Sequence, residues 1–104
     1  MNKITIKSKI KLFSLSSMFY NCNNIINIKF IKFNTTNVTN MSWMFYKCKN
    51  LSELDLSSFN TNNVIDMKGI FSGYYYYFSL LIINKLNIKK FEEEINISKI
   101  KINK

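Results

Sequence analysis

The two cysteines of this chain are the residues best suited to chemistry, and each one ends the same five-residue pattern. Residues 18–22 read MFYNC and residues 44–48 read MFYKC, so Cys22 and Cys48 hold the same place in two copies of one motif. Equivalent positions in adjacent repeats would stack at roughly 5 Å, which is within disulfide range. Free cysteines also pack as small apolar residues. We favour a ladder of buried thiols, and a disulfide between Cys22 and Cys48 stays open.

Other reactive chemistry has few residues to draw on. The chain contains no His, two Cys, and Gly only at positions 69 and 73. Acid–base catalysis by His, a catalytic triad, a zinc site and a Gly-rich phosphate loop all need residues that are missing. The acidic run at residues 92–94 is interpreted as a solvated patch. We therefore expect no enzymatic activity, no metal site and no cofactor.

The composition describes one small basic domain. The chain has 104 residues, 47% of them hydrophobic, and a formal net charge of +9, which is enough for a single core. All 15 cationic side chains are Lys, and without Arg a sequence-specific nucleic-acid reader is not expected. Non-specific binding to nucleic acid or to an anionic membrane surface stays an alternative function.

An internal repeat with a period of 26 positions organises the chain. Residues 18–43 and 44–69 align without a gap and share 11 identities, and Ile25, Ile28 and Phe30 align with the apolar Leu51, Leu54 and Leu56. A period of this length is typical of stacked repeat proteins. We predict one solenoid domain over residues 1–104. Its parts are a degenerate N-terminal repeat or cap (1–17), two repeats (18–43 and 44–69), a degenerate repeat (70–94) and a Lys/Ile-rich tail (95–104).

Two periodicities alternate within each repeat. The pattern from Leu51 to Leu56 has period 2, as in a strand with one buried face. The apolar stripe of the other half has helical spacing, after an N-cap at Thr36 or Asn37; it comprises Val38, Met41, Met44, Phe45 and Cys48. The prediction is an α/β fold of strand-turn-helix units, with a helix of two to three turns and a parallel strand ladder.

The terminal segments are less regular. Residues 3–12 and 95–102 alternate Ile with Lys or small polar residues, which fits either edge strands that close the stack or low-complexity tails. The apolar stretch YYYYFSLLII at 74–83 is too short for a transmembrane helix and is interpreted as a buried strand with its approach. Residues 1–20 lack the pattern of an export signal.

The repeat motif L-x-x-L-x-L-x-x-F-(N/D)-T-x-x-V-x-x-M-x-x-M-F-x-x-C, which runs through residues 18–69, resembles the 26-residue leucine-rich repeats of BspA-like surface proteins. The resemblance implies a leucine-rich-repeat solenoid at the cell surface or outside the cell, acting in adhesion through protein or glycan contacts. This chain departs from the pattern in having few repeats, no export signal and no Cys in its third unit. Two alternatives follow: a truncated family member without independent function, and a cytoplasmic location if the chain is not exported.

The solvent side of the strand ladder is the predicted binding face. The predicted contact residues are Asn27, Lys29, Ile31, Glu53, Asp55 and Ser57, continued by Leu80, Ile82 and Asn84 on a third unit. The alternative role for Lys29 and Asp55 is a stabilising cross-strand ion pair. Trp43 and Tyr46 are further candidates, either as exposed contacts or as packed aromatics. The expected partner is a protein or glycan, and the oligomeric state does not follow from these residues.

Overall fold

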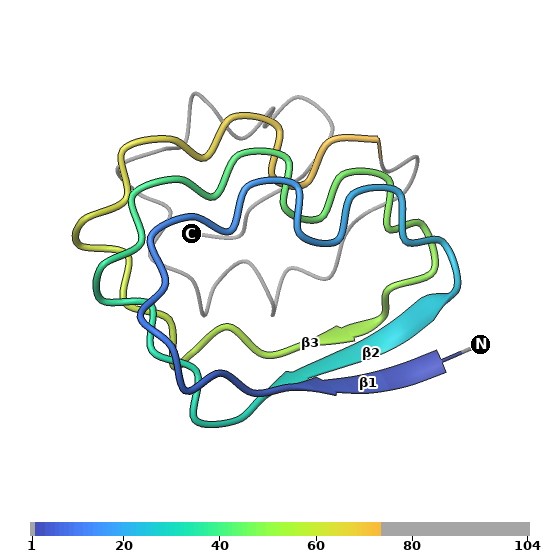
Figure 1. Ribbon diagram of the computed structural model, residues 1–104. Coiled ribbons are helices and arrows are strands. Elements are labelled where there is room, and N and C mark those ends of the chain that lie inside the picture. The colour runs from blue at the N-terminus through green and yellow to red at the C-terminus, as the bar shows by residue number, and fades with distance from the viewer. Residues whose placement is uncertain (1, 74–104) are drawn as a thin grey trace.

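The computed structural model describes residues 2–73, in which the chain winds through three stacked circuits (Figure 1). We call each circuit a rung: the first spans residues 2–24, the second 25–50 and the third 51–73. Each rung opens with a strand: β1 (Asn2–Ile6), β2 (Ile25–Phe30) and β3 (Glu53–Leu54). The strands form a parallel sheet in the order β1-β2-β3, which confirms the predicted parallel ladder. The predictions made for residues 74–104 lie outside the described residues.

The register of the sheet follows the sequence repeat. Between β2 and β3, Asn27 pairs with Glu53 and Ile28 with Leu54, so each residue meets its own equivalent in the next repeat. Of the two interpretations of residues 3–12, the structure supports an edge strand for the first part, because β1 ends at Ile6. In β1, Lys3 and Thr5 are exposed and the inward Ile side chains pack against the core.

The opposite side of each rung consists of turns, and the helix predicted over residues 38–48 is wrong. The amides of Tyr46 and Cys48 donate to carbonyls three residues earlier, those of Trp43 and Phe45. Alternate amides cross instead to the next rung, such as Phe45 N to Ile70 O at 3.0 Å and Trp43 N to Lys68 O at 2.9 Å. An α-helix keeps these bonds within itself, so the cross-rung ladder excludes it.

Left-handed backbone positions explain how this turn pattern is built. On its turn side each rung places two residues at positive φ, four apart, and in the first two rungs each is third in a four-residue turn, as in type II turns. These residues are Ser17 and Asn21, then Trp43 and Lys47, then Gly69 and Gly73. Because equivalent positions recur in each repeat, the turns of neighbouring rungs run parallel and form the bridges Ser14–Asn40 and Asn40–Asp66.

The core consists of equivalent side chains stacked from rung to rung. The rings of Phe19, Phe45 and Phe71 lie nearly parallel, with centroids 5.7 and 5.6 Å apart. The predicted apolar stripe is confirmed as buried, because all five of its side chains have 0% exposure. Met18 is 40% exposed, whereas its equivalents Met44 and Ile70 are buried. Met18 belongs to the outermost of the described rungs, where only one neighbouring rung covers it.

Candidate functional site

Strands β2 and β3 carry three of the predicted contact residues, namely Asn27, Lys29 and Glu53. Lys3, Asn27 and Glu53 lie in one row across the sheet, and Lys29 pairs with Thr5 in the next position. The Nδ2 of Asn27 donates to the Oε2 of Glu53 at 2.6 Å. Lys29 and Glu53 are exposed and Asn27 is half-buried. The row thus holds side chains from equivalent places in adjacent repeats within hydrogen-bonding distance.

The other three predicted contact residues lie just beyond the strands. Ile31 follows β2 and is half-buried, and its amide donates to Ile6 O at 2.9 Å. Asp55 and Ser57 follow β3, where the Oδ1 of Asp55 accepts the Ser57 amide at 2.9 Å. That local bond gives Asp55 a role in shaping the chain after β3. The ion pair between Lys29 and Asp55 stays a prediction.

Both cysteine side chains are free thiols. Cys48 is buried, and its Sγ donates to Phe19 O at 3.0 Å across the rung boundary. Cys22 is half-buried, with its Sγ 3.9 Å from Tyr20 O. Over residues 2–73 no group of three or more His, Cys, Asp and Glu side chains is placed to hold a metal ion.

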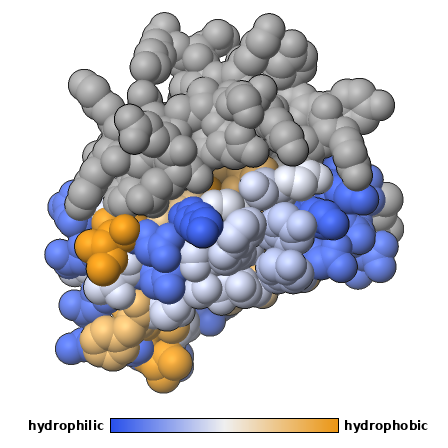
Figure 2. All heavy atoms as spheres, turned by 90° about the horizontal axis from the view of Figure 1, so that it is seen from above, coloured by the Kyte–Doolittle hydropathy of each residue, from blue (hydrophilic) through white to orange (hydrophobic). Residues whose placement is uncertain are grey.

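An aromatic patch, formed by Tyr20, Trp43 and Tyr46, lies on the turn side. The Tyr20 and Tyr46 rings stack with centroids 4.6 Å apart, and Trp43 meets Tyr46 edge-on at 5.5 Å. Lys47 places its Nζ 5.3 Å from the centroid of Tyr46. Tyr20 is 51% exposed, whereas Trp43 and Tyr46 are half-buried. Figure 2 shows this side as a central band of intermediate hydropathy, with hydrophilic residues at one end and a mixture of hydrophilic and hydrophobic residues at the other.

The sequence predicted part of this patch. Trp43 and Tyr46 were candidates, but Tyr20 was not predicted to join them. The signal was present, because Tyr20 and Tyr46 are equivalent in the two repeats and equivalent residues stack. Aromatic side chains of this kind are enriched at protein interfaces, so the patch is a second candidate surface beside the strand face.

A family model described as Mycoplasma protein of unknown function, DUF285, matches residues 8–100. The chain belongs to the DUF285 family. No curated protein and no solved structure matches the chain. The DUF285 match includes the turns of the first rung and the whole of the second and third rungs. It therefore covers the aromatic patch, both thiols and every predicted contact residue on β2 and β3.

In this DUF285 chain, no helix within residues 2–73 is long and apolar enough to cross a membrane.

Proposed function

We propose that this DUF285 chain is a non-enzymatic interaction module, part of a leucine-rich-repeat solenoid of the BspA-like surface type. Its partner is a protein or a glycan, held on the strand face. The observation that carries the proposal is the row of Lys3, Asn27 and Glu53, which are aligned across three strands on the solvent side. Stacked rungs hold such a row without further ordering, so less conformational entropy is lost when a partner binds.

The arrangement of charge supports a partner with charges of both signs. Residues 2–50 contain eight Lys and no acidic residue, whereas residues 51–73 contain Lys68 and three acidic residues, Glu53, Asp55 and Asp66. The charge thus changes sign along the stack, and on the strands the same order holds, with Lys3 on β1, Lys29 on β2 and Glu53 on β3. A partner that matches this order is oriented by it, because like charges brought together oppose the reverse alignment. A location at the cell surface belongs to the same proposal and rests on the resemblance to BspA-like repeats.

The same charge distribution favours a second candidate function, non-specific binding of an anionic polymer. The eight Lys of the first two rungs have no acidic neighbours within those rungs. Such binding is dominated by counterion release and falls steeply as salt is added.

Arrays of immobilised extracellular proteins and glycans test the strand face. We expect the Lys29→Glu variant to lose about tenfold in affinity for a partner that binds the wild-type chain. Lys68→Glu is the matched control, because it makes the same charge change at an exposed residue of the turns, and it should bind nearly as the wild type does. Equal losses in both variants, with binding confined to polyanions and abolished by moderate salt, would support the anionic-polymer alternative instead.

A further inference from the structure

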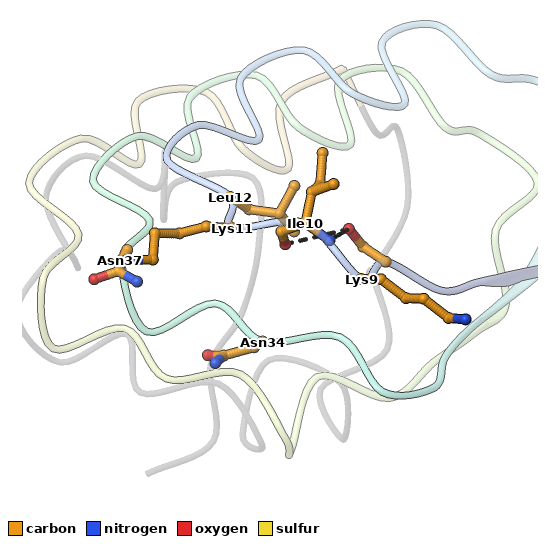
Figure 3. Close-up of a pocket in the computed structure, with 7 residues that line it drawn as sticks. Lys9, Ile10, Lys11, Leu12, Asn34 and Asn37 are labelled. Carbon is orange, nitrogen blue, oxygen red and sulfur yellow. Dashed lines mark hydrogen bonds between the residues drawn. The ribbon is translucent and has the colours of Figure 1, made fainter.

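The first rung crosses from strand to turns by a shorter path than the second. Ile6 pairs with Phe30, an offset of 24 positions, whereas Ser14 pairs with Asn40, an offset of 26. The connecting segment of the first rung, residues 7–13, is therefore two residues shorter than its equivalent, residues 31–39. Figure 3 shows the consequence: residues 9–12 cut across inside the corner of the second rung that carries Asn34 and Asn37.

Because the first rung has this shorter connection, the corner of the second rung (residues 34–37) lacks the hydrogen bonds to the preceding rung that the corner of the third rung (residues 60–63) makes. Between the second and third rungs, Asn63 Nδ2 donates to Thr36 O at 2.6 Å and the Asn60 amide donates to Thr35 Oγ1 at 2.8 Å. Between the first and second rungs, the backbone hydrogen bonds nearest the corner come from the amides of Ile31 and Thr39, one on each side of it. Among the described residues, Asn37 makes no side-chain hydrogen bond to the first rung that corresponds to the bond of its equivalent, Asn63, to the second.

A pocket of about 250 Å³ occupies this place. It is lined by residues 8–12 of the first rung and by Asn34 and Asn37 of the second. Its volume is just below the roughly 300 Å³ at which drug-sized ligand sites begin. The pocket therefore suits a compact group, about the size of one sugar ring.

The polar groups at the pocket are mostly donors. Asn34 Oδ1 already accepts the Thr36 amide at 2.9 Å, which leaves its Nδ2 for a ligand. Lys11 extends toward Asn37, whereas Lys9 points away on the other side (Figure 3). Ser8 Oγ is engaged with the backbone of Ile10, whose amide donates to it at 3.3 Å. The remaining lining residues, Ile10 and Leu12, supply apolar wall.

We propose that this corner pocket binds a sugar acid, either free or at the end of a glycan. Its carboxylate lies between the Lys11 ammonium and the amides of Asn34 and Asn37, where charge-assisted hydrogen bonds are strongest. The sugar ring packs against the apolar wall. The site is separate from the strand-face row, so its test is independent of the proposed function.

The test is a titration of the isotope-labelled full chain with glucuronate, followed by the amide side-chain NMR signals. Glucuronate should shift the Nδ2 signals of Asn34 and Asn37 saturably, and glucose or inorganic phosphate alone should bind at least about tenfold more weakly. A glycan that ends in glucuronate, compared with the free sugar, distinguishes the two sources. Non-saturating shifts, or equal binding of phosphate and glucuronate, would overturn the proposal.

Two variants test the residues assigned to the pocket. Asn37→Leu and Lys11→Gln should each weaken glucuronate binding about fivefold or more, with unchanged thermal melting. Lys68→Gln is the control for lost charge, since Lys68 is an exposed residue of the third rung, and it should bind as the wild type does. If Lys68→Gln weakens glucuronate binding as much as Lys11→Gln does, glucuronate is attracted by the net positive charge of the chain, and the pocket is not a binding site.

Discussion

Gly69 occupies a position where any side chain would be strained. Its φ is +65°, and a Cβ built on it would overlap the six-membered ring of Trp43 from the rung before. Trp43 itself stands at the equivalent left-handed position, with a φ of 59°. Bulky residues at positive φ cost energy that the surrounding structure must offset. The glycine thus makes room for the indole that completes the aromatic patch.

Gly69→Ala should lower the free energy of unfolding by about 2 kcal/mol or more, because left-handed backbone strain of about 1–2 kcal/mol adds to the overlap with Trp43. Denaturant unfolding measures this loss. In a Trp43→Ala background the same change should cost only the backbone strain, so the two substitutions are expected to couple. An identical cost in both backgrounds would show that the indole does not lie over Gly69.

The two thiols differ in burial, and a thiol reagent should tell them apart. Cys22 is half-buried near the end of the first rung, whereas Cys48 has 0% exposure and bonds to Phe19 O. A reagent applied to the native chain should modify Cys22 first and reach Cys48 only when the rungs open. Mass spectrometry of the time course reads this directly. Equal modification rates, or resistance of both residues until a reductant is added, would contradict the free-thiol arrangement.

The strand elements were predictable from the sequence, but the turn elements were predicted only in part. The alternation of apolar and polar residues predicted the parallel strands correctly, because successive side chains of a strand point to opposite faces and the apolar set must take the buried one. The stripe from Val38 to Cys48 was predicted as buried and is buried, yet it is not a helix. Two successive four-residue turns, 41–44 and 45–48, also place apolar residues at i, i+3, i+4 and i+7. Spacing alone cannot separate the two structures.

The signal that could have separated them was the pair of glycines. Gly69 stands third in a four-residue turn, where a left-handed residue is required, and Gly73 is left-handed four positions later. An α-helix tolerates glycine poorly. Their equivalents in the earlier rungs are not glycines, which hid the pattern from a comparison of the repeats.

Alternation within β3 gives a direct test of the strand elements. Leu54 is buried and its neighbour Glu53 is exposed. Leu54→Asp should unfold the chain, because it buries an unpaired charge at a cost of several kcal/mol. Glu53→Lys should cost less than about 1 kcal/mol, since it removes one exposed hydrogen bond to Asn27. Thermal melting followed by circular dichroism compares the two, and equal tolerance of both changes would refute the alternation.

At the scale of the whole molecule, the sequence repeat accounts for most of the contacts that hold the described rungs together. Aromatic rings, amide side chains and backbone bridges all join equivalent positions of adjacent repeats. This could be predicted from the sequence because equivalent residues in stacked repeats must meet. The corner pocket could not be predicted from the sequence, since it arises where the first rung is two residues shorter than the repeat. Residues 1–17 match too few repeat positions for an alignment to show that two-residue deletion.

The measurement that tests the stacked-rung account most directly is a set of nuclear Overhauser contacts from the assigned chain in solution. The account predicts contacts between equivalent residues on both sides of each rung, such as Asn27 with Glu53 on the strands and the Tyr20 ring with the Tyr46 ring on the turns. It also predicts that residues 38–48 lack the run of i to i+3 backbone contacts typical of a helix. A continuous helical pattern over these residues, without the contacts between rungs, would contradict it.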